Sequence, residues 1–263
     1  MKMQSTKWMT CEGLNWLAAG LLAALLAGCA TGPMAPLPES SASSMPRNMP
    51  QERPGLATGW GDEMKSRVSG VEFRRASSKP AGTDTIWYND REGLKAMGGR
   101  TWKVGPMQTA AGGMVEWGIK GKFGWLPAYK SEYWGGKRFV EGRKGSTYSI
   151  VAKNLCRSRL EIVVSVDGLD VMDGTTASFR KRGYIIDPGK TLTIKGFRTG
   201  TDTVAAFKFS SVANSYANMK HGDTRNVGVA GLAVFTEKNV DPWKWMPVEV
   251  GRRESARAFA KAP

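Results

Sequence analysis

The chain is poor in the residues that build metal and redox sites. Its 263 residues include one histidine, His221, and three cysteines, Cys11, Cys29 and Cys156. One histidine excludes a multi-histidine zinc site. A catalytic Cys-His pair would require the fold to bring Cys156 and His221 together. GxSxG and GxxxxGK[ST] motifs are also absent, which excludes a nucleophile elbow and a phosphate-binding loop of those forms.

Long apolar runs are equally scarce, and the one that exists lies near the start. Residues 14–27 (LNWLAAGLLAALLA) follow Lys2 and Lys7 and are too short to span a bilayer comfortably. A positive segment, an apolar segment and then small residues are typical of a signal peptide. We therefore predict a signal peptide over residues 1–28.

The end of this segment, Leu26-Ala27-Gly28-Cys29, resembles the processing box of bacterial lipoproteins. The resemblance implies removal of residues 1–28, a diacylglyceryl group on the Cys29 sulfur and an acyl group on its new amino terminus. Ala30 in place of aspartate implies sorting to the outer membrane, and we expect the body to face the periplasm. Cys156 would then be the one thiol left, so no intrachain disulfide could form. We expect it partly buried near a turn.

Acidic residues are outnumbered. There are 23 Asp and Glu against 38 Lys and Arg, and the net charge is +15. Loss of Lys2, Lys7 and Glu12 with residues 1–28 would leave 22 against 36, or +14. An exported basic protein meets lipid headgroups, lipopolysaccharide phosphates and peptidoglycan carboxylates before nucleic acid, so no nucleic-acid partner is expected. The basic residues are scattered, however, and a solvated surface explains them as well.

The composition divides the rest of the chain into four segments. Residues 29–58 are rich in proline and serine and predict a tether. Residues 59–141 form an aromatic and glycine-rich β region, residues 142–238 form a regular β module, and residues 239–263 form a basic tail that contains tryptophan.

Strand signals dominate the regular module. Runs of β-branched and aromatic residues are separated by turn sequences such as Asp167-Gly168 and Asp187-Pro188-Gly189. The expected strands are 147–152, 159–166, 183–187, 191–197, 204–210 and 227–235. This spacing predicts a mainly β fold, an antiparallel β-sandwich or jelly roll. Helices are expected at 90–97, capped by Asn89 or Asp90, and at 253–261.

The body as a whole resembles a family of exported bacterial proteins of unknown function. The resemblance covers most of residues 59–237, and its most specific part is the series VDGLDVMDG, RGYIIDPG and VGVAGLAVF. It implies a β-sandwich-like module and no particular chemistry.

The aromatic and glycine-rich block is the first candidate for recognition. Indole and phenol rings can stack on sugar faces, and cations beside them can pair with carboxylate or phosphate. Packing of the same rings into the sandwich core is the alternative. With two tryptophans of the tail, the candidate contacts for a glycan or a partner are Trp102, Trp117, Trp125, Tyr129, Tyr133, Trp134, Lys137, Arg138, Trp243 and Trp245.

Carboxylates suggest two further sites. Asp167, Asp170 and Asp173 are spaced closely enough to supply several calcium ligands, although hairpin turn chemistry explains them without a metal, and no other cofactor is expected. A glycan-active hydrolase would need a pair of carboxyl groups. Glu116, Glu132 and Glu141 could supply one, but their spacing does not demand it.

Trp243 and Trp245 would share one face of an extended segment, either to latch the tail onto the body or to contact a partner. The sequence as a whole favours a lipid-anchored, non-catalytic envelope protein. We expect a scaffold or assembly component that contacts an envelope protein complex. The alternatives are a binding module for anionic glycans of the envelope and, less favoured, a glycan hydrolase.

Overall fold

Two β-sheets packed face to face make up the body of the protein in the computed structural model, which describes residues 53–259. The predicted mainly β, sandwich-like fold is confirmed. The signal segment, Cys29 and the tether as far as residue 52 lie outside the described residues. Within the described range, no helix has both the length and the apolar character needed to cross a membrane.

The first sheet has the strand order β1-β15-β9-β5-β4. Three short strands extend it: β13 pairs with β9, β14 with β15 and β6 with β5. Its strands are β1 (Leu56–Lys65), β4 (Met107–Ala110), β5 (Val115–Gly121), β6 (Gly124–Trp125), β9 (Thr147–Asn154), β13 (Thr191–Ile194), β14 (Gly196–Arg198) and β15 (Thr203–Ser211).

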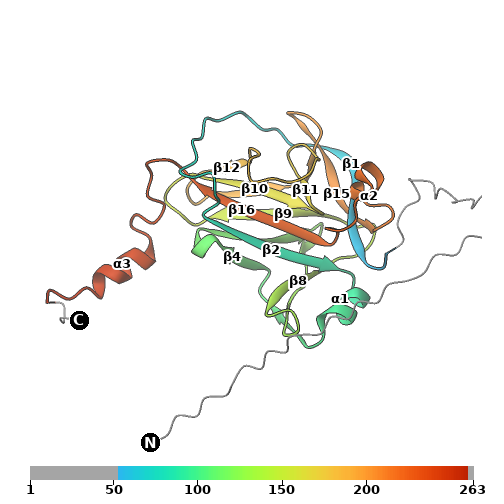
Figure 1. The fold of residues 1–263 in the computed structure, drawn as a ribbon, viewed down its shortest axis with the longest axis horizontal. Coiled ribbons are helices and arrows are strands. Elements are labelled where there is room, and N and C mark those ends of the chain that lie inside the picture. Colours follow the sequence, from blue (N-terminus) through green and yellow to red (C-terminus); the bar gives the residue numbers. More distant parts are fainter. Residues whose placement is uncertain (1–52, 260–263) are drawn as a thin grey trace, which may run out of the picture. The chain divides into compact units, whose positions relative to one another are not determined.

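The second sheet has the order β11-β10-β16-β2-β8-β7-β3, and β12 also pairs with β10. Its strands are β2 (Gly82–Asn89), β3 (Thr101–Val104), β7 (Ala128–Ser131), β8 (Lys137–Glu141), β10 (Leu160–Val166), β11 (Leu169–Asp170), β12 (Tyr184–Ile186) and β16 (Val229–Thr236). The pair β2 and β8 is parallel. Figure 1 shows β10, β16 and β2 side by side.

Helices are few and short. They are α1 (Arg91–Gly98), α2 (Tyr216–His221), α3 (Pro247–Glu254) and the 3-10 turn η1 (Ala111–Gly113). The expected helix at 90–97 is confirmed as α1, whose N-cap Asp90 accepts a hydrogen bond from the backbone N–H of Gly93 at 2.7 Å.

The helix expected at 253–261 is wrong in position. α3 begins at Pro247, where the fixed φ of proline suits the first helical residue, and it ends at Glu254. All six expected strand runs are strands, and the run at 191–197 is divided into β13 and β14 at Lys195.

The expected boundary at residues 141 and 142 does not separate two structural bodies. β5 pairs with β9, and β2 pairs with β16, so both sheets contain strands from either side of it. The described residues, 53–259, instead all belong to one compact unit. The tether also ends earlier than expected, because Leu56, Ala57 and Thr58 are buried in β1.

Alternation along the strands builds one main core between the sheets. Trp117 on β5 and Phe207 and Phe209 on β15 point inward from the first sheet, and Ile86 on β2 and Ile162 on β10 point inward from the second. All five side chains are almost fully buried. This period of two leaves every second residue of each strand on an outer face.

A buried polar cluster connects the sheets inside this apolar core. Asp167, in the β10–β11 turn, accepts hydrogen bonds from the Tyr88 hydroxyl, from the Thr58 N–H at 2.7 Å and from the Gly228 N–H at 2.8 Å. The Thr58 hydroxyl also lies 2.7 Å from the Tyr88 hydroxyl and 2.6 Å from that of Tyr148. The cluster therefore joins β1 and β9 of the first sheet to β2 and β10 of the second.

Burial raises the pKa of Asp167 from 3.8 to about 6, against the effect of its hydrogen-bond donors, which lower it. Because the folded state binds this proton more tightly than the unfolded chain, the resulting stability is complete below about pH 4. It is lost as the pH rises through 6.

We expect Asp167→Asn to remove roughly 3 kcal/mol of pH dependence from the free energy of unfolding between about pH 4 and pH 7. Asparagine also tolerates the φ of +54° at this position. Urea unfolding at a series of pH values measures the effect. Asp223→Asn is the control, because Arg225 holds the pKa of Asp223 near 2, below the window. If the free energy of unfolding of Asp167→Asn changed with pH as much as that of the parent protein, this would contradict the raised pKa assigned to Asp167.

Candidate binding face

The outer face of the second sheet carries two rows of small side chains. Strand pairing places Ser165, Gly231 and Thr85 beside one another across β10, β16 and β2. It places a second row in the same way, two residues further along each strand. That row consists of Val163, Ala233 and Thr83.

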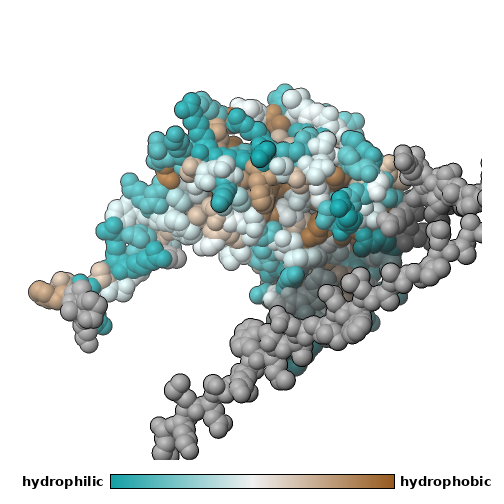
Figure 2. Space-filling view, viewed as in Figure 1, coloured by the Kyte–Doolittle hydropathy of each residue, from teal (hydrophilic) through white to brown (hydrophobic). Residues whose placement is uncertain are grey.

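These six residues form the floor of a hollow of about 470 Å³, here called the outer groove. Residues 177–179 form its wall, and the ring of Phe179 in that wall is 52% exposed. A Cβ atom at Gly231 would lie 2.7 Å from the Ser165 hydroxyl, so glycine keeps the floor low. Figure 2, viewed from this side, shows apolar residues gathered in the middle of the face with hydrophilic residues around them.

A buried ion pair closes one end of the outer groove. The Arg75 guanidinium donates to both carboxylate oxygens of Glu161, at 2.7 and 2.9 Å, and lies 3.7 Å from the centre of the Phe235 ring. The Arg75 and Glu161 side chains are 17% and 3% exposed. Glu161 also accepts a hydrogen bond from the Gly183 N–H at 2.7 Å.

The same guanidinium holds the wall of the groove. Arg75 donates to the backbone carbonyl oxygens of Phe179 and Lys181. Both carbonyls belong to the connection between β11 and β12. The position of Phe179 therefore depends on Arg75.

Aromatic rings close the other end. Trp87 and Phe139 are Cα partners on β2 and β8, and the edge of Trp134 packs on Phe139 with the ring centres 5.5 Å apart. The Lys137 ammonium lies 4.8 Å from the centre of the Trp87 ring and 5.4 Å from that of Trp134. The Trp134 indole N–H donates to the Met97 carbonyl at 2.7 Å, which fixes this cluster to α1.

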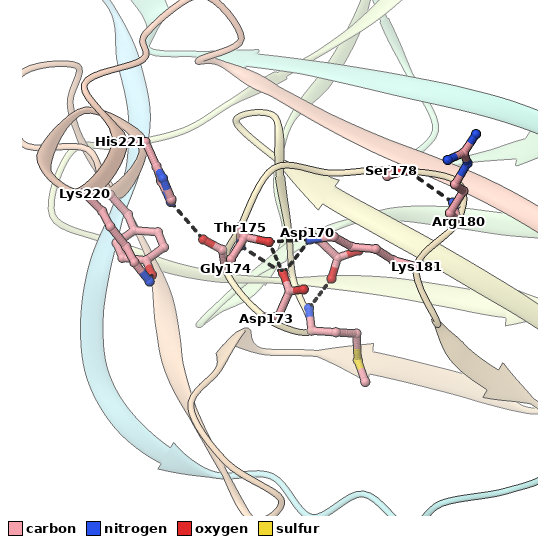
Figure 3. Close-up of polar contacts among 11 residues, drawn as sticks. Asp170, Asp173, Gly174, Thr175, Ser178, Arg180, Lys181, Lys220 and His221 are labelled. Carbon is pink, nitrogen blue, oxygen red and sulfur yellow. Dashed lines mark hydrogen bonds and ion pairs between the residues drawn. The ribbon is translucent and has the colours of Figure 1, made fainter.

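The loop that leads to the groove wall carries two of the three aspartates proposed as calcium ligands (Figure 3). Asp170 accepts a hydrogen bond from the Met172 N–H at 2.7 Å, and burial raises its pKa. Asp173 accepts from the Lys181 ammonium at 2.8 Å and from the Thr175 N–H at 2.9 Å. These donors lower the pKa of Asp173 although partial burial opposes them.

The three aspartates have separate partners, since Asp167 lies in the buried cluster between the sheets. Residues 53–259 contain no group of three or more His, Cys, Asp or Glu side chains arranged to hold a metal. Asp167 and Gly168 have φ values of +54° and +78°, which a tight hairpin turn needs. The geometry agrees with the turn interpretation, and a cation at this loop would have to displace Lys181 from Asp173.

Two of the predicted contact residues belong to the interior. Trp117 is completely buried, and its indole N–H donates to Asp84 at 2.6 Å. Arg138 is 5% exposed, and it donates to the Gln108 side chain at 2.8 Å and to two backbone carbonyls. The prediction of surface contacts is wrong for both, because strand alternation points them between the sheets. Burial also lowers the pKa of Arg138.

The remaining residues of the aromatic block are separated on the surface. Trp134 and Lys137 lie at the end of the outer groove. Trp102 on the edge strand β3 is 46% exposed, Trp125 on β6 is 40% exposed and Tyr133 is 84% exposed. The structure thus does not gather them into one site.

Tyr129 lines a second hollow, of about 350 Å³, beside α1. Its hydroxyl donates to Glu141 at 3.3 Å, and Glu141 also accepts from Arg91 at 3.0 Å. Burial and Glu141 raise the pKa of the Tyr129 phenol. Of the other carboxylates considered for hydrolysis, Glu116 is on β5 in the first sheet, and Glu132 follows β7 in the second.

The two tail tryptophans do not share a face, because residues 242–245 form a turn rather than an extended segment. Trp243 packs against the main core beside the buried Met246, whereas Trp245 is 49% exposed beneath the Arg253 guanidinium. This geometry favours the latch over the paired aromatic edge.

Cys156 and His221 have different surroundings. The Cys156 thiol is buried 3.9 Å from the Met114 carbonyl, and burial raises its pKa to about 11. His221 lies 3.0 Å from the Gly174 carbonyl. A thiol with a raised pKa is a poor nucleophile.

No protein-family model, curated protein or solved structure matches this chain. The resemblances inferred from the sequence therefore stay predictions. No local sequence pattern marks the outer groove. Its floor residues are individually ordinary, and the strand alternation of 159–166 and 227–235 was the one signal that they shared a face.

We expect Arg75→Met to lower the free energy of unfolding by about 3–5 kcal/mol, because it leaves Glu161 buried without its partner. It should also speed tryptic cleavage at residues 180–182, because the wall loses two hydrogen bonds. Urea unfolding and limited proteolysis measure these effects.

Arg225→Met is the matched control. Its pair with Asp223 is exposed to solvent, so this variant should change the free energy of unfolding very little. The double variant Arg75→Met/Glu161→Gln should regain part of the loss. Equal losses in the two single arginine variants would contradict the assigned role of Arg75.

Proposed function

We propose that this protein is a lipid-anchored, non-catalytic component of the bacterial cell envelope that holds a partner protein on its outer groove. The lipoprotein-like box at Cys29 supports the anchor, and the absence of aspartate after it supports outer-membrane sorting with the body toward the periplasm. The groove, with its fixed ends and low floor, is the observation that supports partner binding.

The chemistry of the groove suits an apolar side chain from a partner. Its floor consists of small residues, so a projecting group can enter without moving the sheet. Phe179 offers an exposed ring on one side, and Arg75 and Glu161 hold it in place before any partner arrives. An exposed apolar depression bordered by polar residues is typical of protein interaction sites.

One observation favours a second candidate, the binding of an anionic envelope glycan. Four hydroxyl side chains line the groove: Thr83, Thr85, Ser165 and Ser178. Hydroxyls beside an exposed ring can hydrogen-bond and stack on a sugar, and Lys137 lies at the aromatic end to pair with a carboxylate. Such binding should weaken as salt rises.

A photo-reactive amino acid at position 179 should crosslink to one dominant protein in intact cells, because that side chain borders the groove. Mass spectrometry of the purified adducts identifies what is attached. The same residue placed at Lys190, in an exposed turn away from the groove, is the control.

If positions 179 and 190 gave the same crosslinked products, this would contradict a partner protein at the groove. Reproducible attachment of position 179 to glycan alone would select the second candidate.

The anchor is tested separately. Cys29→Ser should abolish incorporation of labelled palmitate and make the protein extractable from the membrane fraction by a high-salt wash. Cys156→Ser, which alters a buried thiol, should leave both labelling and fractionation unchanged. Continued labelling of Cys29→Ser would overturn the anchor.

A further inference from the structure

The hairpin between β5 and β6 carries an apolar side chain that is exposed and is not packed in the core. Lys122 and Phe123 form its two-residue turn, between Gly121 and Gly124. Phe123 is 97% exposed, and the Lys122 ammonium lies 5.6 Å from its ring centre. Neither residue of the turn has a positive φ, so the turn accepts many side chains and does not by itself select a phenylalanine.

Lysines surround this hairpin on the outer face of the first sheet, the side opposite the outer groove. Lys120, Lys122 and Lys195 line a shallow hollow of about 220 Å³ together with Met64. Lys208 stands opposite Thr147, which lines the same hollow. We call these four lysines the lysine face.

None of the four lysines forms an ion pair with any residue of the part that the structure describes. Glu116 on β5 points to the same side of the sheet as Lys120, but it stands opposite Lys153, four residues away along the strand. The lysine face thus presents positive charge that is free to pair with an external anion.

Apolar side chains accompany this charge. Trp125 is the Cα partner of Lys120, so both project from the same side of the hairpin, and its ring is 40% exposed. Met64, beside the hollow, is 39% exposed. The face therefore combines flexible cations with exposed apolar groups at and around one projecting tip.

We propose that the lysine face and the β5–β6 hairpin dock the protein on an anionic lipid bilayer, with Phe123 entering the interface between headgroups and acyl chains. Lysine ammonium groups on long stems pair with lipid phosphates, and aromatic rings prefer the boundary between water and hydrocarbon. An open sheet face offers these groups to an extended surface.

A bilayer explains the tip better than a polysaccharide does. Charge alone would serve an anionic glycan, but a single ring at the apex of a hairpin has no second wall with which to enclose a sugar. A ring that enters a lipid interface has to project from the protein surface, and it does not have to enclose a ligand. Such docking would not depend on acylation at Cys29, because all of the residues involved lie in the described part of the chain, 53–259.

Sedimentation of residues 46–263 with lipid vesicles tests the proposal. This unit contains every strand and the whole described core. We expect binding to vesicles of equal parts phosphatidylglycerol and phosphatidylcholine, and much weaker binding to phosphatidylcholine alone. Lys120→Gln/Lys195→Gln should weaken binding about 25-fold, at about fivefold per lysine. Phe123→Ser should weaken it about fivefold or more.

Phe179→Ser and Arg180→Gln on the opposite sheet are the matched controls, since they remove an exposed ring and an exposed cation elsewhere. Both should bind vesicles as the parent does, and all variants should melt at similar temperatures. The proposal is overturned by absent vesicle binding or by equal losses in the controls. It is also overturned if the lysine variant loses binding to soluble polygalacturonate while Phe123→Ser binds vesicles unchanged.

Discussion

The buried carboxyl of Asp167 is the constraint on which the two-sheet arrangement depends. It lies in the turn after β10, and its partners Thr58, Tyr88 and Gly228 come from β1, β2 and the segment before β16. A buried carboxyl without these donors would be costly, so the strands that supply them must keep their positions. The relative placement of the sheets, and with it both outer faces, follows from this cluster.

Two features of the second sheet form the outer groove: the small side chains of its floor and one ion pair. Residues that are paired across neighbouring strands lie on the same face of the sheet. The small residues of the two rows therefore lie together and leave a depression. Arg75 and Glu161 then fix the loop that forms the wall. An exposed loop would otherwise lose its order easily.

The two outer faces differ in chemistry, and the proposals differ accordingly. The second sheet offers a depression with apolar and hydroxyl groups, which suits a partner that projects into it. The first sheet offers lysines and a projecting ring at Phe123, which suit a surface that the protein itself enters. A protein attached to a membrane through one face leaves the opposite face open to other molecules.

The fold class follows from local sequence signals, because a period of two and turn residues such as Asp167-Gly168 need no tertiary context. Asp90 marks a helix start in the same way, and Ser215 and Gly222 carry the corresponding start and stop signals around α2. The folded structure was needed to show that Trp117 and its neighbours divide between core and surface, and that rows from distant strands form one groove. Strand order and register set those relations, and they depend on long-range pairing that no local pattern encodes.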